Sequence, residues 1–236
     1  MIRIVNRKIQ RLKISKKYMK LMYWFHKTFG EKYLGDLGFD FKGKPSRIEI
    51  VQKIIDIKKY KNYLEIGTFN NELFNSIKCE NKIGVDPERG GTHRETSDNF
   101  FLKNTKNFDC VFIDGLHHYK QVKKDIQNSL KFLNPNGIIL LHDCLPSNYF
   151  LQAIPRCQWE WNGDVWKALV EFRSNNSCDT YTCYADQGIG IILKRKNKNP
   201  LEIEIKDFSK IKFNTFFKNH KTLMNIIDYE NLLKII

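Results

Sequence analysis

Two apolar runs flank a helical segment between residues 109 and 145, and each run ends in polar residues. The first ends at Asp114-Gly115 and the second at His142-Asp143. Two such runs around an amphipathic helix predict a strand-helix-strand unit of a parallel sheet. Neighbouring parallel strands end at the same edge, where open α/β sheets bind ligands. The side chains expected there are Asp114, His117, His118, His142 and Asp143.

Each aspartate also has an ordinary alternative role, because Asp114 and Asp143 could simply cap the helices that follow them. For either residue alone the two interpretations are balanced. Two acids with histidines beside both of them favour a functional site.

The composition indicates one main domain. The chain has 236 residues, 42% of them apolar, which is enough for a substantial core. No apolar run approaches the roughly 18 residues of a membrane span, and the N-terminus lacks a signal-peptide pattern. Six cysteines occur without a Cys-x-x-Cys pair, which favours reduced thiols. We therefore expect a cytoplasmic protein without a transmembrane segment.

The formal net charge is +14, and much of the excess lies before residue 62. Basic and apolar residues interleave there and predict a basic amphipathic helix that ends near Phe29-Gly30. Three roles are open: packing on the core or on a second subunit, contact with a membrane surface, and contact with nucleic acid. Packing is favoured and nucleic acid is the least favoured partner, since apolar faces usually pack. A homo-oligomer through the terminal helices and a location at the membrane surface remain alternatives.

A second helix leads into the first strand. Residues 31–44 contain three glycines and predict a loop, and Pro45-Ser46 opens a helix that runs to about Tyr60. Residues 62–67 then form a strand that ends in a single-glycine turn. Strand, glycine turn and helix let backbone N–H groups approach a nucleotide-like ligand, although one glycine makes a weak phosphate loop.

The next predicted strand, residues 81–86, ends in Asp86, about 20 residues after the glycine turn, where a carboxylate can accept both hydroxyls of a ribose. Residues 92–97 are expected to form a short third strand. Ser97 or Asp98 should cap the helix that follows.

These motifs, in this order, resemble those of class I S-adenosylmethionine-dependent methyltransferases. Within that superfamily, the chain is most similar to a branch found among glycan and natural-product sugar O-methyltransferases. The resemblance covers about residues 45–195 and includes later segments at 162–168 and 186–191. The segments that carry it most clearly are Tyr63–Gly67, Gly84–Asp86, Phe112–His117 and Leu140–Cys144.

The resemblance implies a Rossmann-like, doubly wound α/β sheet of about seven strands, mostly parallel with an antiparallel last strand, and helices on both faces. Residues 180–184 would supply strand six. We divide the chain into a basic helix and loop at 1–44, a methyltransferase domain at 45–195, and a strand and helix extension at 196–236. In that extension, residues 201–205 are a strand candidate and residues 223–236 a helix.

The resemblance also assigns the S-adenosylmethionine site. Glu65, Gly67 and Thr68 match the motif that meets the methionine end of the cofactor, Asp86 matches the ribose acid, and Ser97 lies near the adenine position.

Two further cofactor residues follow from the same motifs. Asn71 replaces the usual second glycine, and asparagine tolerates the positive φ required there. Asp114 lies at the tip of the neighbouring strand.

Methyl transfer to oxygen requires that the acceptor be positioned and its proton removed or shared. His117, three residues after Asp114, matches the presumed general base of the sugar O-methyltransferases that the chain resembles. The alternative is that His117 only bonds a backbone carbonyl. His118 points elsewhere on a helix, and His142 is the next candidate base.

In the metal-dependent relatives that the chain resembles, an acid at the position of Asp114 and an acidic pair after strand five hold magnesium. Here the pair is His142-Asp143, and histidine suits manganese, iron or zinc better than magnesium. Two alternatives stay open. Either Asp114, His142 and Asp143 hold a divalent ion such as Mg or Mn, or no ion binds and His142 lines the site.

The leading hypothesis is an S-adenosylmethionine-dependent O-methyltransferase that acts on a sugar hydroxyl of a glycan or glycosylated metabolite. Trp159, Trp161 and Trp166 could stack on the sugar or pack a lid. A second hypothesis is a nucleic-acid-binding protein that uses the basic N-terminal helix. A nicotinamide-dependent oxidoreductase is disfavoured, because Gly-x-Gly-x-x-Gly is missing.

Overall fold

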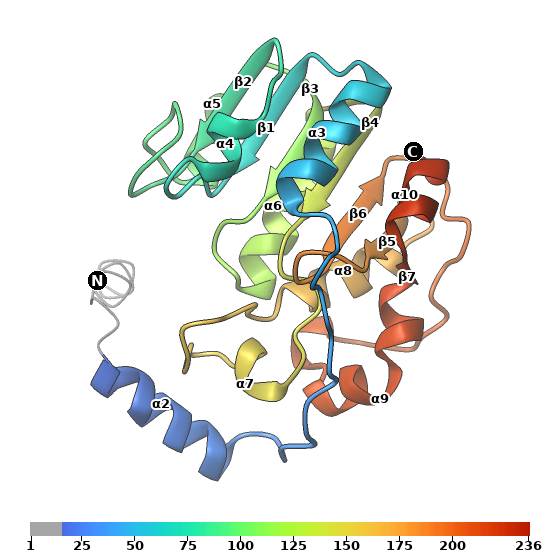
Figure 1. Cartoon of the computed structure of the whole chain (residues 1–236). Helices are drawn as coiled ribbons and strands as arrows, with labels where there is room; N and C mark the ends of the chain where they lie inside the picture. The colour runs from blue at the N-terminus through green and yellow to red at the C-terminus, as the bar shows by residue number, and fades with distance from the viewer. Residues whose placement is uncertain (1–15) are drawn as a thin grey trace.

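The computed structural model describes residues 16–236, and the first part of the predicted basic helix lies outside them. A seven-stranded sheet in the order β2-β1-β3-β4-β6-β5-β7 forms the centre of the molecule (Figure 1). Neighbouring strands are parallel except where β6 pairs with β4 and β5. The predicted Rossmann-like sheet is confirmed. Its strands are β1 (Asn62–Ile66), β2 (Asn81–Val85), β3 (Phe108–Ile113), β4 (Leu133–Leu141), β5 (Asp179–Cys183), β6 (Ile189–Leu193) and β7 (Ile226–Ile227).

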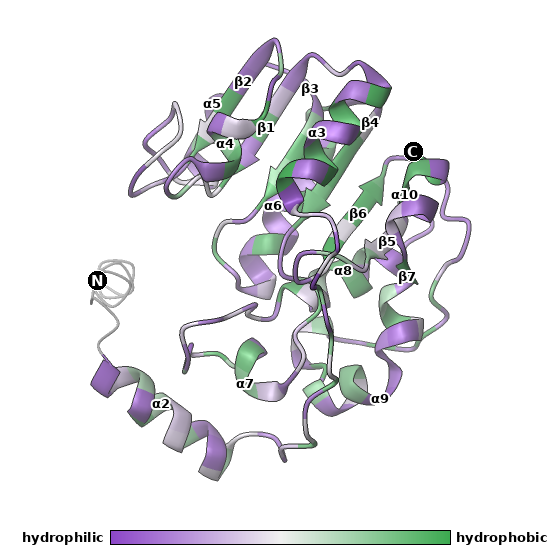
Figure 2. Ribbon diagram, in the orientation of Figure 1, coloured by the Kyte–Doolittle hydropathy of each residue, from purple (hydrophilic) through white to green (hydrophobic). Residues whose placement is uncertain are grey.

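Helices cover both faces of this sheet, and their apolar residues form two clusters with alternate residues of the strands. In β1, Leu64 and Ile66 face one cluster and Tyr63 faces the other, as the two-residue period of a strand requires. The central strands β3, β4 and β6 are accordingly among the most hydrophobic parts of the ribbon (Figure 2). One face carries α5 (Ser97–Lys103), α6 (Tyr119–Lys131) and α8 (Val165–Arg173), and the other carries α3 (Arg47–Lys58), α4 (Glu72–Ser76) and α10 (Tyr229–Ile235).

The remaining helices lie at the carboxyl edge of the sheet and beyond it. They are α2 (Lys16–Phe29), α7 (Tyr149–Gln152), the short 3-10 helix η1 (Phe208–Lys210) and α9 (Phe213–Met224). The predicted end of the basic helix at Phe29-Gly30 is confirmed, as is the helix opened by Ser46, whose side chain forms a capping box with Glu49. No helix within residues 16–236 is long and apolar enough to cross a membrane.

The third strand predicted at residues 92–97 is wrong. One bridge, between Val85 and His93, is all the pairing that this segment makes within the described chain. The segment contains no apolar residue to bury, and Thr96 instead caps α5 by accepting the N–H of Asn99. Ser97 and Asp98, predicted as caps, therefore lie inside the helix.

The C-terminal segment also differs from its prediction. Residues 201–205 form no strand, and the helix predicted at 223–236 is broken at Asn225, whose φ of 48° ends α9. Ile226 and Ile227 then pair with Thr182 and Cys183 of β5, so the extension supplies the seventh strand. Asp228 caps α10 after this pairing.

Candidate active site

The turn after β1 contacts the end of β3 at the carboxyl edge of the sheet. Gly67 has φ of +87°, and a Cβ atom there would lie 2.1 Å from the carbonyl oxygen of Asp114. The N–H of Asp114 donates to the carbonyl of Ile66 at 2.8 Å. Glycine is thus required both for the turn and for the close approach of the two strand ends.

Four residues from the ends of β3 and β4 meet beside this turn, and we call Asp114, His117, His142 and Asp143 the histidine cluster. Nε2 of His117 donates to Oδ1 of Asp114 at 3.1 Å. Nδ1 of His117 donates to the carbonyl oxygen of Trp161 at 2.9 Å and lies 3.2 Å from Oδ2 of Asp143. The meeting of these side chains, predicted from the strand-helix-strand pattern, is what the structure shows.

His142 is buried deeper in the same cluster. Its Nδ1 lies 3.6 Å from Oδ1 of Asp114 and 3.5 Å from Oδ2 of Asp143. Its Nε2 donates to Oδ1 of Asp186 at 2.9 Å. Arg47 approaches the same oxygen, with Nη1 3.6 Å from Oδ1 of Asp186, and its backbone N–H donates to Oδ2.

All four ring nitrogens of the two histidines therefore face oxygen atoms that accept hydrogen bonds. Burial alone would lower the pKa of His117, but its bond to Asp114 and the nearby Asp143 carboxylate raise it to about 9. Likewise, burial opposes the charge on His142, yet the two carboxylates raise its pKa well above the usual value. The positive charge of the two imidazoliums in turn keeps the pKa of Asp114 low despite burial. Two positive rings thus offset the aspartates around them at neutral pH.

The cluster includes a group of atoms with the spacing of a metal site. Ligand atoms of Asp114, His117 and Asp143 all lie within 4.8 Å of one another. Asp114 and Asp143 are two of the ligands proposed from sequence, while the third donor in this group is His117, which the sequence favoured as the base. Two carboxylates and an imidazole suit manganese, iron or zinc, so the donor set fits a divalent ion.

Asn162 and Asp186, to which the sequence assigned no role, hold the histidine cluster in place. Nδ2 of the buried Asn162 donates to Oδ1 of Asp143 at 2.9 Å and to Oε1 of Gln187 at 3.1 Å. Asp186 holds His142 by accepting the hydrogen bond from its Nε2. The only sequence signal was that both positions fall in the later segments of the family resemblance.

The tryptophans separate into different environments. The Trp161 ring stacks on His117 with centroids 5.4 Å apart, and its Nε1 donates to the carbonyl of Ala153 at 2.9 Å. Trp166 is buried in the core, so its proposed contact with a ligand is wrong. Trp159 is exposed. His118 lies outside the cluster and precedes α6 as its N-cap residue.

Asp86 is held by the backbone of the turns that follow β1 and β2. Its Oδ1 accepts the N–H groups of Glu88 at 2.8 Å and Arg89 at 2.9 Å, and its Oδ2 accepts that of Phe69 at 3.0 Å. A carboxylate offers about four acceptor positions. One position therefore remains, on Oδ2.

The other cofactor residues predicted on this side, Glu65, Thr68 and Asn71, also contact other parts of the protein. Glu65 is buried, accepts the Tyr63 hydroxyl at 2.7 Å, and has a pKa raised to about 8 by burial. Asn71 has φ of 63°, as its position predicted, and its side-chain oxygen accepts the N–H of Gly91 at 2.6 Å. Thr68 is buried beside this contact. The turn after β1 is thereby tied to the turn after β2.

Ser97, the first residue of α5, contacts α6. Its hydroxyl donates to Oδ1 of Asp125 at 2.6 Å and accepts from Nε2 of Gln121 at 3.3 Å. Burial raises the pKa of Asp125 to about 6. The hydroxyl proton of Ser97 is therefore used within the protein, which leaves Ser97 at most an acceptor for a ligand.

Comparison with known proteins bears on this arrangement. Residues 79–144 match the family model of a methyltransferase domain, a segment that runs from β2 to the end of the histidine cluster. No curated protein sequence matches the chain.

Solved structures share the fold at low sequence identity. A putative O-methyltransferase from Klebsiella pneumoniae is 12% identical, with a TM-score of 0.50 over 76% of this chain and 99% of that chain. Cofactor-bound Rv0187 from MTB is 11% identical, with a TM-score of 0.50 over 75% of this chain and 96% of that chain. The chain therefore shares the fold of these two structures.

Proposed function

We propose that this enzyme transfers the methyl group of S-adenosylmethionine to a hydroxyl oxygen of a sugar, in a glycan or a glycosylated metabolite. The observation that carries the proposal is the histidine cluster beside the Gly67 turn, at the carboxyl edge of the sheet. Residues 79–144, which include that cluster, match a methyltransferase-domain model. Buried acids and imidazoles at that edge are groups that can bind and deprotonate a hydroxyl. The nucleic-acid alternative has no support in this fold.

The reaction is a displacement at carbon. The acceptor oxygen attacks the methyl carbon in line with the sulfonium, the carbon–sulfur bond breaks, and sulfur keeps the electron pair to give S-adenosylhomocysteine. The acceptor must also lose its hydroxyl proton. The protein therefore needs to align the two substrates and to offer a group that shares or takes that proton.

The proposed cofactor contacts follow from the turns after β1 and β2. Asp86 has one free acceptor position for a ribose hydroxyl, and the turn from Gly67 to Asn71 would lie along the methionine end. Glu65 lies beneath that turn as a buried carboxyl whose charge is disfavoured by burial. The ammonium group of the cofactor would favour its ionised form. Ser97 remains the proposed neighbour of the adenine.

A divalent ion is proposed at Asp114, His117 and Asp143, with His142 as the fourth nearby donor. When bound, such an ion would polarise the acceptor hydroxyl and lower its pKa. It would also supply the positive charge that the two imidazoliums supply without it. Manganese suits these ligands better than magnesium.

The metal-free alternative assigns His117 the role of general base. A base must first be neutral, whereas Asp114 and Asp143 hold the proton on His117 at pH 7. His117 can act in this way only after the negative charge around it has been offset. His142 is less accessible than His117 and serves as the second candidate.

The sugar acceptor rests on the aromatic residues beside the cluster. Trp161 stacks on His117, and the exposed Trp159 lies two residues away along the chain. Aromatic faces with adjacent polar groups suit a sugar ring, which has apolar C–H faces and polar edges.

A labelled-methyl assay tests the proposal. The full chain is incubated with methyl-labelled S-adenosylmethionine, manganese and a panel of acceptors that comprises free sugars, nucleotide sugars and catechols. The proposal expects label on sugar oxygen and formation of S-adenosylhomocysteine. Label only on catechols would contradict the sugar acceptor, and failure to bind S-adenosylhomocysteine would contradict methyl transfer itself.

A further inference from the structure

The helix α2 is attached to the rest of the chain along one side. Met19 and His26, seven residues apart, are buried on the inner side, and Tyr23 between them is partly covered at 41% exposure. Nε2 of the buried His26 donates to the carbonyl of Pro155 at 2.8 Å, and its Nδ1 lies 3.2 Å from the Tyr149 hydroxyl oxygen. The Tyr23 ring lies 4.5 Å from that of Phe150. These contacts fix the orientation of α2 and leave its opposite face to solvent.

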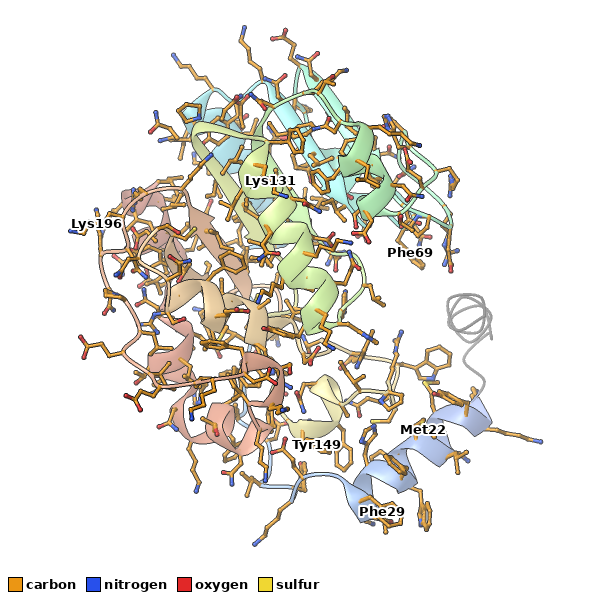
Figure 3. The ribbon with its side chains drawn as sticks, turned by 180° about the vertical axis from the view of Figure 1, so that it is seen from behind. Met22, Phe29, Phe69, Lys131, Tyr149 and Lys196 are labelled. Atoms are coloured by element: carbon orange, nitrogen blue, oxygen red, sulfur yellow. The ribbon has the colours of Figure 1, made fainter. Side chains whose placement is uncertain are left out.

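Large apolar side chains gather on that outer face. Leu21, Phe25 and Phe29 follow one another at four-residue steps and are 56%, 42% and 67% exposed, and the neighbouring Trp24 is 59% exposed. The rings of Phe25 and Phe29 lie 5.5 Å apart, and those of Trp24 and Phe29 lie 6.2 Å apart. Phe29 points away from the body of the molecule (Figure 3). A contiguous exposed patch of this kind usually marks an interaction surface.

Lysines flank the apolar patch. Lys16 and Lys20 are one helical turn apart, Lys27 follows two turns later, and all are exposed. No ion pair with another residue of the range 16–236 involves them. The sequence of residues 1–29 contains no aspartate or glutamate, so the charged side chains of α2 are all basic.

We propose that the outer face of α2 is a membrane-binding surface that lies in the interface of an anionic bilayer. Trp24 and the apolar patch would enter the boundary between headgroups and acyl chains, and the lysines would extend to the lipid phosphates. The basic charge of α2 favours an anionic bilayer over a second copy of the chain as the partner of this face. Pairing of two such faces would bring lysines together without acids to offset them.

The attachment of α2 also sets where the bilayer would lie. The segment that holds α2, at residues 149–155, continues to Trp161, whose carbonyl accepts from His117. The membrane contact would therefore be at the same end of the molecule as the histidine cluster. The contact itself does not depend on the proposed methyl transfer.

Vesicle co-sedimentation of the full chain tests the proposal. The probes are vesicles of phosphatidylcholine alone and of phosphatidylcholine with phosphatidylglycerol, each at low and high salt. We expect binding to the anionic vesicles that weakens with salt, and little binding to the neutral ones. Absence of binding to anionic vesicles at low salt would overturn the proposal.

Two sets of variants separate insertion from simple charge attraction. Replacing Leu21, Phe25 and Phe29 by Ser should reduce the partition coefficient by about tenfold for each side chain. Replacing Lys16, Lys20 and Lys27 by Gln should reduce it by about fivefold for each lysine. The matched controls are Ile57→Ser with Leu102→Ser, and Lys53→Gln with Lys106→Gln and Lys131→Gln, which change equally exposed residues elsewhere and should bind as the parent does.

Other binding partners of the outer face of α2 would give different results. A dimer in vesicle-free solution that the apolar triple variant converts to monomer would show that a second copy covers the face. Tighter binding of single-stranded RNA than of anionic vesicles, unaffected by the apolar substitutions, would show a nucleic-acid surface. Either result overturns the proposal. Unchanged circular dichroism and unchanged binding of S-adenosylhomocysteine confirm that the variants are folded.

Discussion

The two sides of the sheet edge hold their carboxylates by different kinds of hydrogen-bond donor. On the β1 and β2 side, Asp86 accepts three backbone N–H groups. On the β3 and β4 side, Asp114 and Asp143 face the imidazoles of the histidine cluster. A backbone N–H keeps its proton at every physiological pH, whereas an imidazole can lose its proton or bind a metal instead. Asp86 is therefore held in the same way at every physiological pH, whereas the histidine cluster can change its protonation.

We infer from this difference that the two sides of the sheet edge bind different substrates. A fixed carboxylate suits a cofactor that is bound in the same way in every cycle. A cluster whose charge can change suits the acceptor, whose proton must leave during the reaction. Variants of Asp86 should then weaken cofactor binding, whereas variants of the histidine cluster should lower turnover.

The largest effect is expected on the histidine cluster. Asp143→Asn removes a charged donor of the proposed metal group, and we expect turnover to fall by about a thousandfold, because metal-ion catalysis supplies several kcal/mol. Excess chelator should have a similar effect on the parent. Asp56→Asn, at an exposed acid on α3, is the matched control and should retain activity. Full activity of the parent in chelator would contradict the metal proposal and leave His117 as the proposed base.

The sequence predicted this cluster because its members are tied to strand ends. Once two apolar runs are assigned to neighbouring parallel strands, the residues just after them must meet, and Asp114 and Asp143 do. The partners Asn162 and Asp186 come from loops whose path depends on packing elsewhere. No periodicity in the sequence determines where such loops fold back.

The fold was predictable to a similar degree and for the same reason. The buried strands are apolar runs, which a sequence reveals directly. The supposed strand at residues 92–97 has no apolar residue, and the actual seventh strand is only Ile226–Ile227, too short to show a period. Its pairing depends on β5 offering a free edge, which is a tertiary property.

A second effect concerns pH. In chelator, His117 has a folded-state pKa of about 9 against about 6.5 unfolded, so its contribution to stability is complete below pH 6.5 and is lost as pH rises through 9. The free energy of unfolding should fall by at most about 3 kcal/mol over that window. Burial of Glu65, with a pKa of about 8, acts in the same direction.

Urea unfolding of the parent and of His117→Gln at several pH values isolates the histidine contribution, since Glu65 is common to both proteins. The difference in unfolding free energy between the two proteins should shrink as pH rises. A difference that is independent of pH would show that His117 is not held as an imidazolium.

A smaller effect is expected at Asn162. Asn162→Ala removes the amide that orients Asp143, and we expect manganese affinity to fall by about tenfold, at the low end of the range for residues that position metal ligands. Electron paramagnetic resonance of free manganese measures the affinity. Asn128→Ala on α6 is a control outside the cluster. Equal manganese affinity in parent and Asn162→Ala would contradict the positioning role.

The division between the two sides is tested most directly by calorimetric titration of S-adenosylhomocysteine into the parent, Asp86→Ala and Asp143→Asn. We expect S-adenosylhomocysteine to bind the parent, and to bind Asp143→Asn with near-parental affinity. For Asp86→Ala we expect at least about tenfold weaker affinity, since a hydrogen bond to a charged group contributes about 1.5–3 kcal/mol. Equal affinity in the parent and Asp86→Ala, or equal losses in the two variants, would contradict this division.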